Sequence, residues 1–147
     1  MYLGSLAALS QAKDKTNKQL SKKYEELEVG YEFPNVSYEL DPSIVSKYEE
    51  AVEARSPLTN VVPPMAIAAY AMKAASQFVD MPPGSIHTSQ EIEFLKPVTV
   101  GSHIYCQSRV IQKLSRANLN MLVIELATFD QDKEPVLSGK TTLILAS

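Results

Sequence analysis

The stretch that most restricts how this chain can fold is residues 65–79, MAIAAYAMKAASQFV, which is apolar on almost every side when read as a helix. Its clearly polar side chains, Lys73, Ser76 and Gln77, all lie in the second half. A helix that is apolar nearly all round is a buried helix, and this one is too short to span a bilayer. The rest of the chain must therefore enclose it.

The segments that follow this helix read as strands. Apolar patterns predict strands at residues 86–95, 102–113, 119–130 and 136–146. Both faces of the stretch 119–130 are mostly apolar, which predicts a central place in the sheet. Four long strands in succession indicate an antiparallel sheet with one face that must be covered, and the apolar helix is the available cover.

The segment before the apolar helix predicts one strand and one helix. Residues 36–40 alternate between apolar and polar side chains, as a half-buried strand does. Asp41 and Pro42 are typical of an N-cap and a first helical position, so a helix is predicted over residues 42–54. Four residues share one face of this predicted helix: Ile44, Tyr48, Ala51 and Val52.

This order of elements predicts an α+β hot-dog fold, in which a long antiparallel sheet wraps around one buried apolar helix. We assign that domain to residues 24–147. Residues 1–23 form an N-terminal extension that is a candidate for a helix. Leu3, Leu6 and Leu9 recur every three residues there. The extension is either a helical arm that packs on a partner or a frayed terminus.

The composition narrows the classes of function. The 147 residues carry a formal net charge of -3, with a pI of about 5.4, whereas non-specific binding to nucleic acid needs a basic surface. The single cysteine, Cys106, excludes an internal disulfide and a cysteine-rich zinc site, and two histidines are too few to predict a metal site. We therefore expect no metal, no cofactor, no membrane span and a cytoplasmic location.

Three pieces of sequence resemble the MaoC-like dehydratase/hydratase family, most closely the N-terminal hot-dog half of its two-domain members. They are LEVGYEF at residues 27–33, the Pro-Pro-Met opening of the apolar helix, and GSIHTSQEIEFLKPVTVGSHIYCQSRVIQKL at residues 84–114. The resemblance implies a hot-dog dimer and an (R)-specific enoyl-CoA hydratase or 3-hydroxyacyl-thioester dehydratase lineage in fatty acid metabolism. It also implies an acyl-thioester partner, on CoA or acyl carrier protein, in a tunnel along the buried helix at the dimer interface.

The family's acid-base pair is the aspartate and histidine of the motif Asp-x-Asn-Pro-x-His, and this sequence departs from it. When the motif is aligned on Pro57, Ala54 stands at the aspartate, Ser56 at the asparagine and Thr59 at the histidine. Neither alanine nor threonine acts as a base near neutral pH. We therefore predict no catalytic residue at Ala54 or Thr59, and a non-catalytic subunit that pairs with a chain carrying the motif.

Four residues are candidates for substrate binding: His87, Thr59, Asn60 and Tyr70. His87, at the start of the predicted strand 86–95, is a surrogate acid or base, a contact for a pantetheine arm, or a structural histidine at a strand edge. Tyr70 either lines a tunnel with its hydroxyl or covers the core at a dimer seam.

The sequence gives four other residues no expected role in binding or catalysis. Glu91 and Glu93 share one face of a strand, so they are expected to face solvent, as is His103. Cys106, in an alternating strand, is expected in the core. Two alternatives to the non-catalytic subunit stay open: a homodimeric hydratase or thioesterase that uses His87 or Thr59, and an acyl-CoA- or lipid-binding module without chemistry.

Overall fold

The computed structural model describes residues 21–53 and 60–147. One short 3-10 helix, two α-helices and five strands follow one another along these ranges. They are η1 (Tyr24–Glu26), β1 (Val36–Glu39), α2 (Pro42–Ala51), α3 (Pro64–Ser76), β2 (Ile86–Phe94), β3 (His103–Arg116), β4 (Leu119–Asp130) and β5 (Pro135–Ala146).

The five strands form one antiparallel sheet with the order β1-β3-β4-β5-β2. The predicted central place of residues 119–130 is confirmed, because β4 lies between β3 and β5. β1 and β2 form the two edges of the sheet. Almost every residue of β2 is exposed, so this edge is open along its length.

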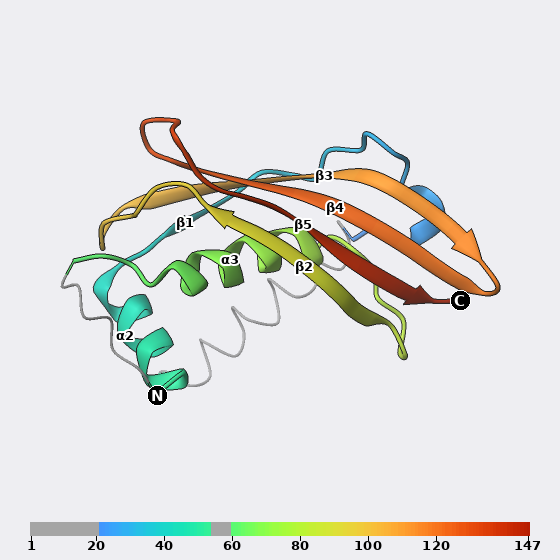
Figure 1. Ribbon diagram of the computed structural model, residues 1–147, viewed down its shortest axis with the longest axis horizontal. Helices are drawn as coiled ribbons and strands as arrows, with labels where there is room; N and C mark the ends of the chain where they lie inside the picture. Colours follow the sequence, from blue (N-terminus) through green and yellow to red (C-terminus); the bar gives the residue numbers. More distant parts are fainter. Residues whose placement is uncertain (1–20, 54–59) are drawn as a thin grey trace, which may run out of the picture.

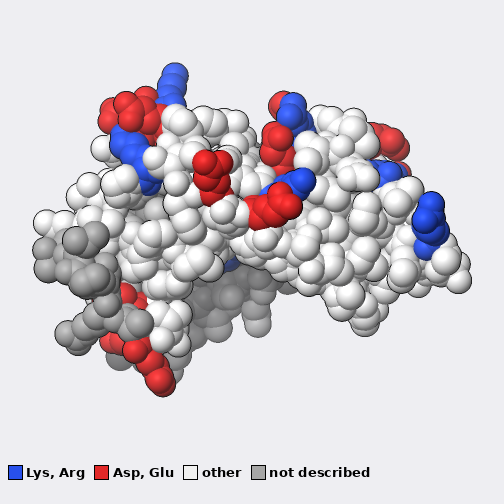
Figure 2. Space-filling model, in the orientation of Figure 1, with Lys and Arg blue, Asp and Glu red and all other residues white. Residues whose placement is uncertain are grey.

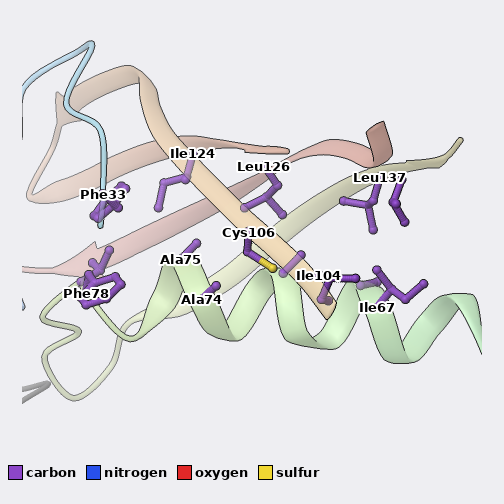
Figure 3. Close-up of a cluster of buried hydrophobic side chains, with 14 of the residues drawn as sticks. Phe33, Ile67, Ala74, Ala75, Phe78, Ile104, Cys106, Ile124, Leu126 and Leu137 are labelled. Atoms are coloured by element: carbon purple, nitrogen blue, oxygen red, sulfur yellow. The ribbon is translucent and has the colours of Figure 1, made fainter. Parts of the chain in front are cut away.

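α3 lies against one face of the curved sheet, as Figure 1 shows. Side chains from the strands point towards it, among them Ile104, Ile124 and Leu126 (Figure 3). Five alanines of α3 are at most 2% exposed: Ala66, Ala68, Ala71, Ala74 and Ala75. Because their side chains are small, the helix can lie close to the strands, and the predicted sheet around one apolar helix is confirmed.

α2 begins as predicted and ends earlier. Asp41 is its N-cap, since Asp41 Oδ1 accepts a 2.8 Å hydrogen bond from the Ile44 N–H, and Pro42 follows in the first turn. The helix ends at Ala51 rather than at residue 54, and Val45 is its buried residue. Of the four residues predicted to share one face, Ile44 and Tyr48 are partly buried, whereas Ala51 and Val52 are exposed.

The turn between β3 and β4 is tighter than the sequence predicted. β3 runs to Arg116 instead of residue 113, and Arg116 pairs with Leu119 across a two-residue loop. That loop consists of Ala117 and Asn118, with φ angles of 51° and 67°. Positive φ at both positions matches the right-handed twist of the flanking strands, so the hairpin forms even though alanine is a poor residue for that conformation.

The surface carries charges of both signs. Figure 2 shows acidic and basic side chains intermixed on the visible face. Two ion pairs link neighbouring strands: Arg109 Nη2 lies 2.9 Å from Glu125 Oε1, and Lys140 Nζ lies 3.4 Å from Glu91 Oε2. Among the residues described, no helix is long and apolar enough to cross a membrane.

Candidate functional site

The segment that leads into α3 is fixed to the loop after β2. The Val100 N–H donates to the Asn60 carbonyl at 2.8 Å, and the Val62 N–H donates to the Val98 carbonyl at 2.8 Å. Asn60 has a φ of 75°, a left-handed conformation that asparagine tolerates better than most residues. These contacts hold the start of α3 in a defined place beside the C-terminal end of β2.

The start of α3 offers a backbone donor. Pro63 is the N-cap and Pro64 follows it, and no side chain caps the helix. The Ala66 N–H donates to the Pro63 carbonyl at 2.9 Å, and Pro64 has no N–H. Within the described ranges, the Met65 N–H has no acceptor, and its residue is 58% exposed. A free N–H at the positive end of a helix dipole can donate to a polarised carbonyl or an anion.

Tyr70 packs towards the β1 edge of the sheet. Its ring lies 4.6 Å from the ring of Tyr38, between centroids, at an interplanar angle of 46°. Burial, with smaller effects from Cys106 and Tyr70, raises the pKa of Tyr38 to about 12. Burial and the charge of Asp41 also raise the pKa of Tyr70. Both phenols therefore stay protonated at neutral pH and act only as hydrogen-bond partners.

His87 lies on the opposite edge of the sheet from the Tyr38–Tyr70 pair. Its Nε2 is 2.5 Å from the hydroxyl of Thr141, which is 4% exposed. The pairing of β2 with β5 is irregular between His87 and Ser89, and this bulge lets the ring reach Thr141. The sequence could not show this separation, and the structure does not bring His87 and Tyr70 together.

The inner side of β2 is left largely uncovered by α3. His87, Gln90, Ile92 and Phe94 pair with Leu143, Thr141, Gly139 and Leu137. Residues opposite each other on neighbouring strands place their side chains on the same face of the sheet. Three of the partners, Leu137, Thr141 and Leu143, are buried on the side of α3. The four β2 residues therefore face that side, and we name them the β2 strip. α3 packs chiefly beneath β3 and β4. Phe94 is consequently 42% exposed.

The two ends of the β2 strip, His87 and Phe94, lie far apart. From His87 to Phe94 the strand extends roughly 20 Å at about 3.3 Å per residue. The chain reverses between α3 and β2, so His87 lies near the C-terminal end of α3 and Phe94 near its start. Within one chain, His87 is therefore too far to act on a group held by the Met65 N–H, because proton transfer needs hydrogen-bond distance.

The remaining predicted residues divide into confirmed and undescribed ones. Glu91, Glu93 and His103 are exposed, and Cys106 is buried at 3% exposure, as predicted. Ala54 and Thr59, the positions of the family's acid-base pair, lie outside the described residues. In the described part of the chain, no group of three or more His, Cys, Asp or Glu side chains could hold a metal ion.

A polar cluster that the sequence did not reveal joins the end of β2 to the β4–β5 turn. Lys96 Nζ lies 2.7 Å from Asp130 Oδ2 and also contacts Glu134. Asp130 Oδ1 accepts from the N–H groups of Asp132 and Glu134. The Lys96 ammonium, with these donors, lowers the pKa of Asp130. Lys96 lies 34 positions before Asp130 in the sequence, and every bond of the cluster is internal, so the cluster fixes the β4–β5 turn.

A groove lies between α2 and the side of α3 that faces away from the sheet, with a volume of about 470 Å³. Its walls are apolar and aromatic, with two lysines, Lys47 and Lys73, and without a carboxylate or imidazole among the described lining residues. Asp41 is close enough to raise the pKa of Tyr70. Its carboxylate, however, already accepts the N-cap hydrogen bond of α2 from the Ile44 N–H. The described surroundings of α3 thus offer no acid-base pair.

No protein-family model matches the sequence, and no curated protein matches it. Solved structures do resemble it. The (R)-hydratase PhaJ1 from Pseudomonas aeruginosa is 20% identical over 84% of this chain and 85% of that chain, with a TM-score of 0.73. A MaoC-like dehydratase from Rhodospirillum rubrum is 16% identical over 83% and 94%, with a TM-score of 0.65.

A heteromeric assembly is also among the similar structures. In the ChsH1-ChsH2 complex from Mycobacterium tuberculosis, one chain is 9% identical over 80% of this chain and 98% of that chain, with a TM-score of 0.63. Identities this low establish an architecture, and function is determined by the site. The described chain has the hot-dog fold, and these solved structures share its architecture.

Proposed function

We propose that this chain is an acyl-thioester-binding hot-dog subunit of the (R)-specific enoyl-CoA hydratase and 3-hydroxyacyl-thioester dehydratase lineage, without an acid-base pair of its own. It pairs in the cytoplasm with a second hot-dog chain that supplies the pair. The fold and its hydratase and dehydratase neighbours support the lineage. The observation that carries the non-catalytic role lies in the sequence, where Ala54 and Thr59 stand at the positions of the family's aspartate and histidine.

The open edge of β2 supports a paired assembly. Its unpaired backbone groups form a template for another strand, and apolar side chains accompany them: Ile86 is 56% exposed and Leu95 is 45% exposed. A second hot-dog chain docked at this edge would also cover the β2 strip. The strip would then become a closed apolar passage beside α3, of the kind that holds an acyl chain.

In this assembly the substrate-binding residues have separate roles. The Met65 N–H at the start of α3 donates to the thioester carbonyl, and Asn60 and Thr59 lie in the segment that leads to it. His87 and the rest of the β2 strip contact the acyl or pantetheine portion. Tyr70, whose ring packs at a tilt against Tyr38 at the other edge, covers the core rather than the passage.

The test compares turnover with binding. The pure protein is mixed with crotonyl-CoA and with (R)-3-hydroxybutyryl-CoA, and hydration or dehydration is followed by enoyl-thioester absorbance while binding is measured by calorimetry. We expect saturable binding without turnover. Turnover should then appear on co-expression with a hot-dog chain that retains Asp-x-Asn-Pro-x-His. Turnover by the pure protein, or absence of binding, would contradict the proposal.

One observation favours a second candidate, a homodimeric hydratase or thioesterase. Because the bulge after His87 takes one residue out of the ladder, an antiparallel β2–β2 pairing centred on Glu91 would place the partner's His87 opposite Phe94, beside the start of α3. His87 would then act across the interface. This candidate predicts turnover by the pure protein that is lost in His87→Ala and kept in His103→Ala, a matched exposed histidine.

A further inference from the structure

The face of β2 that points away from α3 carries two glutamates at the open edge of the sheet. Successive residues of a strand point to opposite faces, so Glu91 and Glu93 lie on the face away from the β2 strip, here named the outer face. The Glu91 side chain is 72% exposed, and its Oε2 lies 3.4 Å from Lys140 Nζ. Within the described ranges Glu93 has no ion pair, so one lysine faces two carboxylates at this edge.

A trough of about 540 Å³ adjoins both glutamates. It is lined chiefly by outer-face residues of β2, β4 and β5, and the charged ones described are Glu91, Glu93, Glu125 and Lys140. Glu125 is bound to Arg109 at 2.9 Å, so the excess negative charge lies at the β2 side of the trough. A long basic side chain from a strand docked at the edge would reach into this space.

The edge beside the glutamates can pair with another strand. β2 is bonded to β5 on one side, and it is an edge of the sheet on the other. The free backbone groups of an edge do not choose a partner by themselves, because every extended strand presents the same N–H and C=O groups. Side-chain pairs across the new seam make the choice. Glu91 and Glu93 therefore decide which strands fit.

A second copy of this chain fits this edge poorly. In an antiparallel pairing, outer-face residues of one copy meet outer-face residues of the other, and like charges directly opposite each other are destabilising. Centred on Glu91, the pairing sets Glu91 opposite the same residue of the second copy. Centred on Ile92, it sets Glu91 opposite Glu93 in both halves. Centred on Gln90, the two copies of Glu91 become diagonal neighbours roughly 7–8 Å apart, which is still within a Debye length at physiological salt.

We propose that Glu91 and Glu93 select the partner at the β2 edge. They disfavour a second copy of this chain and favour an edge strand with Lys or Arg on its outer face. The inference rests on the proposed function, which places another hot-dog chain at this edge. Opposite charges across the seam stabilise the pair and steer its encounter. The homodimer in which His87 acts across the interface is the arrangement that this selection opposes.

A charge-reversed copy of the full chain serves as the test partner. Wild-type protein labelled with ¹⁵N is mixed with unlabelled Glu91→Lys/Glu93→Lys, and the dimers are counted by native mass spectrometry in 50 mM ammonium acetate. We expect the mixed dimer to be at least ten-fold tighter than either homodimer, because only the mixed pair sets opposite charges across the seam.

The matched variant is Glu39→Lys/Glu50→Lys, at two exposed positions on β1 and α2. Both double variants change the net charge from -3 to +1, because each replacement adds two positive charges. The mixed dimer of the matched variant with wild type should stay within two-fold of the wild-type homodimer. A wild-type homodimer as tight as the mixed dimer with the charge-reversed copy, or an equal gain with the matched variant, would overturn the proposal.

Neutral replacement provides a second measurement, in case charge reversal beside Lys140 disturbs the fold. Glu91→Gln/Glu93→Gln removes the repulsion, so its self-association in 50 mM salt should be at least three-fold tighter than that of the wild type. In 500 mM salt, which screens exposed charges, the two proteins should associate equally. Equal self-association in 50 mM salt would show that the glutamates do not select the partner.

These outcomes can be told apart from those that concern the proposed function. Both glutamates lie on the outer face, away from the β2 strip and from the Met65 N–H, so calorimetry should give the same acyl-thioester binding for the wild type and the Gln variant. Absence of thioester binding by the wild type would contradict the proposed function. A wrong order of dimer stabilities would contradict only the selection by Glu91 and Glu93.

Discussion

Gly139 is the position at which a single methyl group should disturb the sheet most. It lies in β5, opposite Ile92 of the edge strand β2. A Cβ atom added there would lie 2.2 Å from the Glu91 carbonyl oxygen and 3.2 Å from the Ile92 Cα. Real Cβ atoms essentially never approach closer than 3.0 Å, so the strands must separate by at least about 0.8 Å, the difference between 3.0 and 2.2 Å.

The cost of Gly139→Ala follows from that displacement. Overpacking a well-packed site costs roughly 1–3 kcal/mol, and each ladder hydrogen bond that lengthens loses up to about 1 kcal/mol. We therefore expect the free energy of unfolding to fall by about 2–4 kcal/mol. For a chain of this size, the melting temperature should fall by roughly 6–12 °C.

The assay is thermal and urea unfolding, followed by circular dichroism, with Ser138→Ala as the matched control on the same strand. The control should change the free energy of unfolding by less than about 0.5 kcal/mol. Without the clash, Gly139→Ala would stabilise the protein by about 0.4–1 kcal/mol, because alanine restricts the unfolded chain. An unchanged or higher melting temperature for Gly139→Ala would therefore refute the reasoning.

Three further predictions concern the core and its tyrosine. Tyr38 has a folded pKa of about 12, above its ordinary value of 10.0, so its contribution to stability is complete below pH 10 and is lost as pH rises from about 10 to 12. Tyr38→Phe should flatten the fall in the urea midpoint over that window, and an identical fall would contradict this. Ile67→Ala should cost about 2–5 kcal/mol in a urea titration, because Ile67 is 2% exposed, whereas the exposed Met65→Ala should cost less than about 0.5 kcal/mol. Burial raises the pKa of Cys106 to about 11, so a thiol reagent at pH 8 should modify Cys106 only after unfolding. A cysteine introduced at an exposed position by Ala69→Cys should react at once, and equal rates for the two thiols would contradict the burial of Cys106.

The architecture could be predicted from the sequence because its signals are local and periodic. The apolar run of α3 predicts a buried helix, and the two apolar faces of β4 predict a strand in the middle of the sheet. The ends of elements were predicted less well. α2 ends at Ala51, and the β3–β4 turn lies at Ala117 and Asn118, where no glycine marks the positive φ angles.

The site was predicted only in part, since its geometry depends on which strands form the edges. Strand order is a long-range property, and nothing in the local pattern shows that His87 and Tyr70 lie at opposite edges of the sheet. The Lys96–Asp130–Glu134 cluster was missed for the same reason, because Lys96 is 34 residues from Asp130 and 38 residues from Glu134 in the sequence. What the residue types did indicate correctly was exposure, as at Glu91 and His103.

The two-residue turn at Ala117 and Asn118 also has a consequence for the order of folding. It closes the shortest loop in the sheet, and loop closure costs entropy that grows with the length of chain enclosed. The pairing of Ile92 with Gly139 encloses 46 residues between them, so we expect it to form after the hairpin. A ribosome releasing this chain would therefore produce a nucleus of β3 and β4 first, and the open β2 edge would be completed last.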